Sequence, residues 1–408
     1  MRDGWIETTL GEVTAVNPGR LKGVSPDDVI RYVDISSVSW DTGIDICSVA
    51  EMPFGQAPGR ARRPINEKDV VVSTVRPRLR AMGQVPPSLA GQVASTGLCV
   101  LRARDSEAIL PDYVWQVVRH HAFTDWLVER ETGSNYPAVR SSDIEAYPFL
   151  LPPIEEQRRI VDLMSHMDAV IERLAEEFES VERMARSLRN EAFGAWSDQF
   201  ELAPAASLFG MLLGRQKSAR QSVGSHVIPY IRSGNIADGF LRLDDVQEMN
   251  FEPDEQHKYA ISSGDVLLAE GGTVGQSALW KEEIQGPVGF DKHVIRLRPV
   301  EGMSTTNYIH QWCRWAFETG LFRETAKGVT ISALGFGRAK ALPVPKVPFE
   351  DQQGQTATLV AADALGQQLA AERSQLLQAR AALLSELLSG LHQIPTSYDE
   401  FIRDEGAA

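Results

Sequence analysis

FLLPPIEEQRRIVDLM, residues 149–164, changes character halfway along its length. Two prolines follow an apolar, strand-like run, and a charged, helix-favouring segment then starts with Glu-Glu-Gln on its first turn. A degenerate copy, VPFEDQQGQTATLV, occupies residues 347–360, with Asp351-Gln352 in place of the Glu-Gln. We interpret the stretch as a joint between a domain and a long helix, at the end of a repeat.

Other segments recur in the same order at a nearly constant offset of about 195 residues. YVDISSV (32–38) corresponds to YIRSGNI (230–236), and INEKDVVVS (65–73) corresponds to ISSGDVLLA (261–269). Each match alone could be chance, but their common order indicates an internal duplication. Short β-branched runs bounded by Gly, Pro, Asn or Asp alternate with helical patterns, so each repeat is predicted to be a compact mixed α/β (α+β) domain.

The predicted organisation therefore has two repeated domains and two long helices. The segments are a first domain (1–150), a first connector helix (151–197), a second domain (198–349), a second helix (350–392) and a C-terminal tail (393–408). The two helices share an apolar stripe, so we expect them to pair as an antiparallel coiled coil. The alternative is that each helix packs on its own domain.

Both helices fit one heptad register. The first core position holds Ile160, Met167, Leu174, Val181 and Leu188, and in the copy Ala362, Leu369, Leu376 and Leu383. The second core position, three residues later, holds Leu163, Val170, Glu177, Met184 and Glu191, and in the copy Leu365, Glu372, Ala379 and Glu386. The shared glutamates predict places where the seam opens or another protein docks. Gly354 and Gly366 interrupt the second helix, so we expect it to begin later than its counterpart.

Composition is typical of a globular chain without a targeting segment. The net charge is −14, but the excess acid lies mostly in the helical segments and the tail, and the two long segments are nearly neutral. No signal peptide or run of about 18 apolar residues is present, which predicts a cytoplasmic protein without a membrane partner. The three cysteines form no CxxC pair, so a disulfide framework or a cysteine-rich zinc site is not expected.

Searches for catalytic and metal-binding motifs give nothing. The chain lacks GxxxxGK[ST], HExxH and GxSxG, and GGTVG (271–275) is interpreted as a tight hairpin. His120-His121 occupy adjacent positions of a predicted helix, where two side chains diverge too far to share a metal. We therefore predict no catalytic residue and no metal site.

Arginine-rich stretches are more informative. Residues 59–82 contain a run of cations, and the prolines and alternation of RPRLR predict an extended loop with exposed guanidinium groups. The candidates for DNA contact in the first domain are Arg60, Arg62, Arg76, Arg78 and Arg80; those in the second are Arg215, Lys217 and Lys292. Arginine can grip phosphate or read guanine in the major groove, although such clusters are often only solvated surface.

Taken together, the chain resembles the specificity subunit of type I restriction-modification systems, from GWIETTLGEV to about Leu391. The features that carry the resemblance are LPPIEEQRRIV, STVRPRLR, ASTGLCVLRA, GSNYPAVRSSDI and the degenerate second copy. It implies a non-catalytic subunit in which each domain reads one half of a bipartite double-stranded DNA target. Two methyltransferase subunits would dock on the helices and bind S-adenosylmethionine, so this chain would hold no cofactor itself, and motor-nuclease restriction subunits would join where present.

Two loops complete the candidate DNA contacts. They are Gly133, Ser134, Asn135 and Tyr136 in the first domain, and Lys327, Gly328 and Thr330 in the second. Asn135 could pair with adenine, or simply form a turn. The main rival interpretation is a coiled-coil scaffold with two protein-binding domains and no DNA affinity, and a third is an enzyme acting on a nucleotide or sugar.

Overall fold

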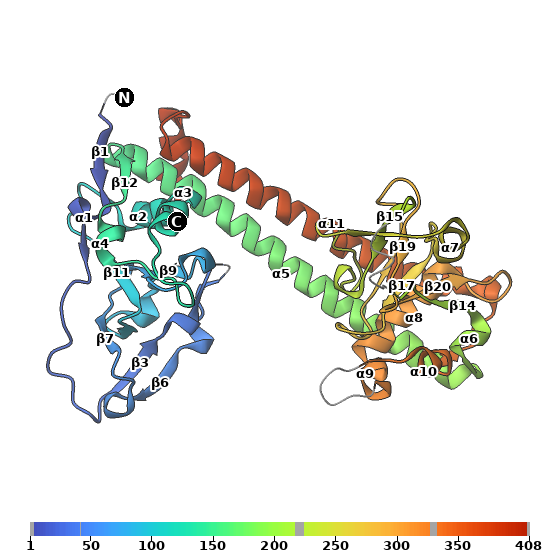
Figure 1. Cartoon of the computed structure of the whole chain (residues 1–408). Coiled ribbons are helices and arrows are strands. Elements are labelled where there is room, and N and C mark those ends of the chain that lie inside the picture. Colours follow the sequence, from blue (N-terminus) through green and yellow to red (C-terminus); the bar gives the residue numbers. More distant parts are fainter. Residues whose placement is uncertain (1–3, 41, 217–223, 327–332, 406–408) are drawn as a thin grey trace. The chain divides into compact units, whose positions relative to one another are not determined.

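A computed structural model describes residues 4–40, 42–216, 224–326 and 333–405. The chain divides into two compact units (Figure 1). Unit 1 consists of Met1–Arg173 with Arg373–Ala408, and unit 2 is Leu174–Glu372. Each unit therefore contains one domain together with a part of each long helix.

Unit 1 is built on two four-stranded sheets of order β2-β11-β8-β9 and β6-β3-β10-β7, with the two-stranded ribbons β1-β12 and β4-β5. The strands are β1 (Ile6–Thr9), β2 (Thr14–Val16), β3 (Val29–Val33), β4 (Val38–Ser39), β5 (Gly43–Ile44), β6 (Ala50–Pro53), β7 (Ala61–Pro64), β8 (Val70–Ser73), β9 (Met82–Gln84), β10 (Val93–Ser95), β11 (Leu98–Ala103) and β12 (Pro148–Leu151). Strand β8, VVVS, is buried at every position because hydrophobic clusters cover both of its faces.

Unit 2 repeats this arrangement. Its sheets are β14-β20-β17-β18 and β16-β15-β19, with the ribbon β13-β21. The strands are β13 (Leu202–Pro204), β14 (Phe209–Leu213), β15 (Val227–Ile231), β16 (Gln247–Asn250), β17 (Val266–Ala269), β18 (Ser277–Leu279), β19 (Gly289–Phe290), β20 (Val294–Pro299) and β21 (Pro343–Pro345). The parallel pair β15-β19 has its counterpart in β3-β10, amid otherwise antiparallel neighbours. The expected duplication and mixed α/β class are confirmed.

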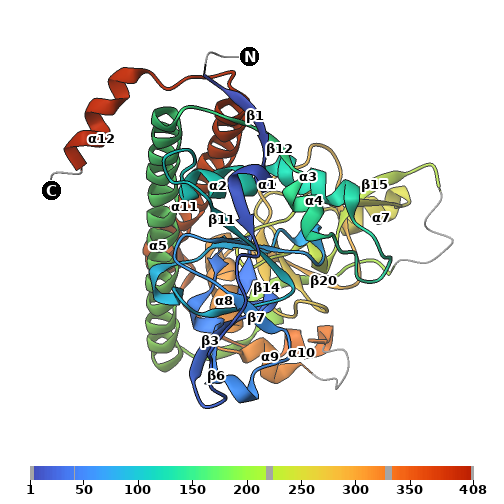
Figure 2. The same ribbon diagram turned by 90° about the vertical axis from the view of Figure 1, so that its left-hand side faces the viewer.

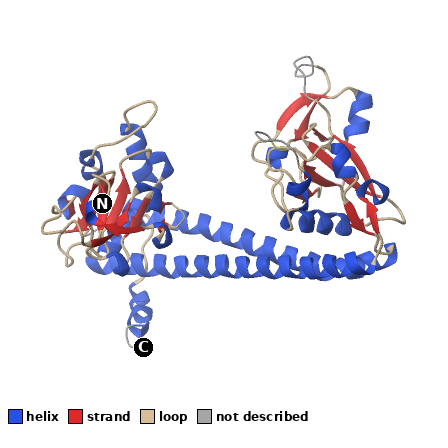
Figure 3. Cartoon of the chain, turned by 90° about the horizontal axis from the view of Figure 1, so that it is seen from below, coloured by secondary structure: helices blue, strands red, loops and turns tan. Residues whose placement is uncertain are grey.

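Short helices accompany the sheets of both units, and the C-terminal one, α12, points away from its sheets (Figure 3). In unit 1 they are α1 (Leu10–Val13), α2 (Pro111–Arg119), α3 (His121–Arg130), α4 (Ser141–Glu145) and α12 (Asp399–Glu405). In unit 2 they are α6 (Ala205–Leu208), α7 (Pro253–Tyr259), α8 (Thr306–Glu318), α9 (Leu321–Thr325) and α10 (Phe336–Lys340). The sequence predicted that His120 and His121 lie within one helix, but the backbone is extended at His120, which lets Val117 of α2 and Phe123 of α3 face the same core.

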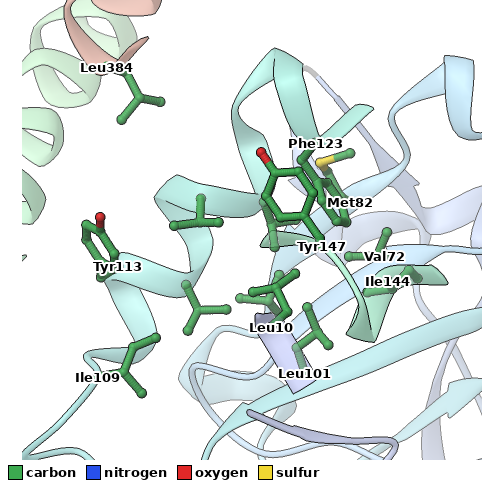
Figure 4. Packing of buried hydrophobic residues seen from close by; sticks show 14 of the residues in the cluster. Leu10, Val72, Met82, Leu101, Ile109, Tyr113, Phe123, Ile144, Tyr147 and Leu384 are labelled. Carbon is green, nitrogen blue, oxygen red and sulfur yellow. The ribbon is translucent and has the colours of Figure 1, made fainter. Parts of the chain in front are cut away.

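The long helices are α5 (Ile154–Gln199) and α11 (Phe349–Leu388). In unit 1 Asp168 of α5 bonds to Arg380 of α11 at 2.5 Å, and in unit 2 Arg189 bonds to Asp363 at 2.6 Å. From the first pair to the second, the residue number increases on α5 and decreases on α11. The paired stretches are therefore antiparallel, as expected. Each stretch also packs on its own domain, and Ile160 joins a core cluster of unit 1. Figure 4 labels Leu101 of β11, Tyr113 of α2 and Leu384 of α11 from the same cluster.

The first core position of the heptad is confirmed on α5, where Ile160 and Leu174 are buried. The second is wrong, because Val170 and Met184 are 51% and 49% exposed and Glu177 is exposed too. The buried and half-buried side chains of α5 lie four residues after the first position, not three. They are Met164, Ile171, Phe178, Ala185 and Ala192.

On α11 the same correction holds. Leu365, Glu372 and Glu386 are exposed, whereas Gly366 and Leu387, one position later, are buried. The four glutamates therefore lie outside the seam and mark no opening in it.

The glycines of the second helix do not delay its start. The helix begins at Phe349 and runs through Gly354 and Gly366. At Gly366 a Cβ atom would lie 2.9 Å from Glu182 Oε1 and 3.8 Å from a Phe178 ring carbon, so this glycine permits close approach of α5 and α11. The expectation failed because helix packing outweighs a propensity difference of about 1 kcal/mol.

The glutamine of the opening stretch explains why that stretch occurs twice. The side-chain amide of Gln157 accepts from the Leu110 backbone N–H at 2.9 Å and donates to the carbonyls of Ala108 and Pro152. Gln352 makes the same three bonds to Thr305, Met303 and Val347 in unit 2. Both glutamines are fully buried, so each ties the first turn of a long helix to the loop that precedes α2 or α8.

Candidate nucleic-acid interface

Two loops that are distant in sequence come together in unit 1. Val75 forms a β-bridge with Ala138, and the Arg76 N–H donates to the Pro137 carbonyl at 2.7 Å. A further bridge between Thr132 and Ala138 closes the second loop at its base. The predicted residues Gly133, Ser134, Asn135 and Tyr136 lie at its exposed tip. Arg76, Arg78 and the GSNY loop thus belong to one surface, which we call the loop surface.

The RPRLR segment is a tight turn and not the extended loop that was expected. Pro77–Leu79 form a 3-10 turn between Arg76 and Arg80, which have φ values of 50° and 51° in the left-handed region. Pro77 is buried beneath the turn, while Leu79 is 64% exposed. The turn therefore presents its side chains in fixed directions.

Arg80 points inward, contrary to expectation. Its guanidinium carbon lies 3.2 Å from the centroid of the Trp40 ring, and Nη2 donates to the Arg119 carbonyl at 2.7 Å. Burial, and next the charge of Arg119, lower the pKa of Arg80. The stacked Arg80 side chain therefore stabilises the turn instead of extending into solvent.

Two of the predicted arginines are paired with carboxylates of the same chain. Arg78 donates from Nε and Nη2 to Glu131 Oε1 at 3.0 and 2.9 Å, and Arg60 donates to Asp34 at 2.5 Å. Arg76 instead stacks over Tyr136, 5.0 Å from the ring centroid, and has no carboxylate partner within the described ranges. Tyr136 is 72% exposed and Arg76 is exposed too, so this pair is an accessible cationic feature of the loop surface.

Arg60 and Arg62 lie at the start of β7, an edge strand of its sheet. The Arg60 carbonyl accepts from the Thr96 N–H, and the Gly97 carbonyl accepts from Thr74, next to the loop surface. Arg62 is exposed and its Nε donates only to the Gly59 carbonyl, at 2.8 Å.

The candidates of unit 2 are not brought together in the same way. Arg215 is buried against Phe251 and pairs with Glu255 at 2.7 Å, so it has a structural role. Lys292 is exposed in the turn before β20. Lys217, Lys327, Gly328 and Thr330 lie outside the described residues.

The GGTVG loop of unit 2 was not among the DNA contacts that were predicted from the sequence. It joins β17 to β18 in a hairpin, as predicted, and Gly271 forms a β-bridge with Ala333. This bridge is the counterpart of Val75–Ala138, so GGTVG occupies the place that RPRLR holds in unit 1. The constant offset between the repeats was the signal that could have identified it.

Within the described parts of the chain, no group of three or more His, Cys, Asp or Glu side chains could hold a metal ion. Nor does any described helix have the length and apolar character needed to cross a membrane.

Comparison with known families agrees with these features. The model of the type I restriction modification DNA specificity domain matches residues 56–183, which include both loops of the loop surface. The type I restriction enzyme HindI specificity subunit of Haemophilus influenzae is 22% identical over 199 residues. That match covers 48% of this chain and 41% of the length of the HindI subunit.

Solved structures share the fold over almost the whole chain. One, from a study of complex assembly and conformational transition of the type I R-M system, has a TM-score of 0.58 and 24% identity, and covers 96% of this chain and 99% of its own. The S subunit of a type I restriction-modification system from M. genitalium has a TM-score of 0.54 and 14% identity, and covers 94% and 96%. The resemblance that the sequence indicated is confirmed.

Proposed function

We propose that this chain, which carries a type I restriction modification DNA specificity domain, reads a bipartite double-stranded DNA target and performs no catalysis itself. The observation that carries the proposal is the overlap of the matched domain, residues 56–183, with the loop surface. That surface combines an unpaired arginine, an exposed tyrosine and the amide of Asn135, which suit phosphate, sugar and base-edge contacts.

The duplication supports two half-sites. The sheets β2-β11-β8-β9 and β14-β20-β17-β18 repeat the same strand order, and the bridges Val75–Ala138 and Gly271–Ala333 are equivalent in the two units. Each unit would then read one half-site with its own loop sequences. Because RPRLR and GGTVG differ completely in charge, the two half-sites would differ in sequence.

The partners in this proposal are two methyltransferase subunits docked along α5 and α11. They would bind S-adenosylmethionine and methylate adenine N6 in each half-site, and motor-nuclease restriction subunits would join the complex where present. The exposed glutamates of both helices, such as Glu177 and Glu372, remain available on the faces turned away from the seam.

The test is to co-express the full chain with an adenine methyltransferase subunit of a type I system, purify the complex, and map methylated adenines across the host genome. We expect one bipartite motif with a fixed spacer. A complex that forms without any methylation motif or DNA affinity would favour a protein-binding scaffold. Chemistry on a nucleotide or sugar by the isolated chain would favour an enzyme.

A further inference from the structure

Strands β3, β6 and β7 of unit 1 lie near one another in Figure 2. A hollow of about 430 Å³ lies beside the sheet that they belong to. It is lined by Arg20, Leu21, Gly23, Val24, Phe54 and Arg62. Cations and apolar side chains thus face one space. Only Arg62 belongs to the candidates that the sequence suggested.

The loop that forms most of this hollow is fixed at both ends. At its start, Arg63 bonds to the side-chain oxygen of Asn17 and donates to the Leu98 carbonyl at 2.6 Å. At its end, the Phe54 N–H donates to the Asp28 carbonyl at 2.8 Å. Because neighbouring residues of a strand face opposite sides, Arg63 anchors the loop while Arg62 is free to line the hollow.

Two glycines allow the loop to curl. Gly19 and Gly23 have φ values of 85° and 71°, in the left-handed region that glycine adopts readily. Arg20 and Leu21 lie between them, so the loop GRLKG presents a cation and an apolar side chain side by side.

The charges of the hollow are not neutralised by the chain. Neither Arg20 nor Arg62 has a carboxylate partner among the residues described, whereas Arg60, two positions from Arg62, is held by Asp34. In a chain of net charge −14, two neighbouring arginines without acidic partners indicate a site for an external anion. Arginine's planar fork suits a phosphate group.

We propose that this hollow binds the DNA backbone: the guanidinium groups of Arg20 and Arg62 contact phosphates, and an adjoining deoxyribose packs on Leu21, Val24 and Phe54. The inference rests on the proposed function and deepens it. Backbone contacts carry no direct sequence information but fix the register of a protein on the duplex. The hollow would thus position unit 1 so that its loop surface meets the half-site.

The test measures binding of the full chain to a fluorescent 40-base-pair duplex of mixed sequence over a range of salt concentrations. Each phosphate neutralised contributes about 0.9 to the slope of log K against log [salt]. The double variant Arg20→Ala/Arg62→Ala should therefore lower the slope by about 1.8. Both side chains are exposed, so the melting temperature should not change.

Arg158→Ala/Arg183→Ala provides the matched control. It removes the same charge, but these arginines are exposed and already paired with Glu155 and Glu179. Its slope should equal that of the wild type. Arg20→Lys/Arg62→Lys should keep the slope and weaken binding a few-fold, because the charge remains and the fork is lost.

The outcomes separate the two proposals. If the wild type binds and the alanine variant keeps the full slope, the hollow is not a backbone site and the proposed function stands. If the wild type has no DNA affinity, alone or with the methyltransferase, both proposals fall. If the alanine variant has a lower melting temperature than the wild type, the lysine variant is the test. An unchanged DNA affinity of the lysine variant would also overturn the backbone site.

Discussion

The arginines of unit 1 differ in the partners that their guanidinium groups have within the chain. Arg78 and Arg60 are paired with Glu131 and Asp34, and Arg80 stacks on Trp40, while Arg76 has only Tyr136. The run of arginines in the sequence predicted these residues as DNA contacts only as a group. It could not rank them, because Glu131 lies far along the chain from the arginine that it neutralises.

Glu131→Gln is predicted to strengthen DNA binding. The change frees Arg78, whose side chain is 66% exposed, to meet a phosphate, so affinity for a mixed-sequence duplex should rise several-fold and the salt slope should steepen by about 0.9. Stability should change by less than about 1 kcal/mol, as for other exposed ion pairs. Glu129→Gln removes the same charge two positions away, from a pair with Arg130, and serves as the control. Equal gains in both variants would indicate a net-charge effect only.

Unit 2 is predicted to lose stability as the pH falls below about 6.5, the ordinary pKa of histidine. His310 is buried, and burial lowers its pKa to about 4, so the unfolded chain binds a proton more readily than the folded one. The stability that neutral His310 maintains is fully present above pH 6.5 and is lost as the pH falls toward 4. The loss in the free energy of unfolding should reach about 2 kcal/mol at pH 5. Urea unfolding at several pH values measures it. His310→Gln should flatten the profile, and an unchanged profile would exclude His310 as its cause.

At the scale of elements, the long helices show where a heptad pattern is ambiguous. Apolar residues occur both three and four positions after the first core position, and only the partner decides between them. On α5 the sequence favours the second set, because the positions three later include Glu177 and Glu191, whereas those four later are apolar. On α11 the positions four later include Arg373 and Arg380, so an apolar row alone does not identify the seam there.

The ion networks that join each domain to the long helices are also duplicated. Asp168 accepts from Arg119 and Arg380, and Asp363 accepts from Arg314, Arg189 and Gln311. The offset of the repeats relates the two aspartates. They differ in burial, since the side chain of Asp168 is 36% exposed and that of Asp363 only 7%.

Asp363→Asn is accordingly predicted to cost more than Asp168→Asn. Removing the carboxylate takes one charged partner from Arg189, which is fully buried, and one from Arg314, although both arginines keep Glu318, so the cost should be about 2 to 3 kcal/mol. Asp168 is partly exposed, so water screens its ion pairs and can hydrogen-bond to the arginines in its absence. Asp168→Asn should therefore lower the free energy of unfolding by about 1 kcal/mol. Chemical denaturation of each variant provides the comparison. Similar losses in both would show that burial does not set the strength of these networks.

Two glycines of α11 offer a matched pair. At Gly354 a Cβ atom would meet nothing within 4 Å, so Gly354→Ala should stabilise the helix by about 1 kcal/mol. At Gly366 it would meet Glu182, whose other carboxylate oxygen accepts from Arg314 at 3.2 Å. Gly366→Ala should therefore gain less, or destabilise. Thermal melting of the two variants tests this, and an equal gain would mean that the seam tolerates a methyl group there.

For the whole molecule, the sequence predicted two copies, their order and their antiparallel helices. It did not predict that each compact unit takes one stretch from each helix. Chain order shows that α5 follows the first domain, but which stretch packs on which core depends on contacts such as Ile160 with Leu384 in a shared cluster. Those contacts join residues more than 200 positions apart, beyond any local pattern.

The length of the paired helices is predicted to set the DNA spacer, if the proposed function holds. Deleting residues 175–181 and 367–373 removes one heptad from each helix, or about 10 Å at 1.5 Å per residue, and preserves the seam register. Since base pairs are spaced by about 3.4 Å, the methylated motif should keep its two half-sites and lose about three base pairs between them. Deleting five residues from each helix instead removes about 7.5 Å but rotates the seam by about 140°, away from its partner, so that variant should lose methylation and stability. Genome-wide mapping of methylated adenines distinguishes these results, and a heptad deletion that methylates the original motif would show that α5 and α11 do not act as a ruler.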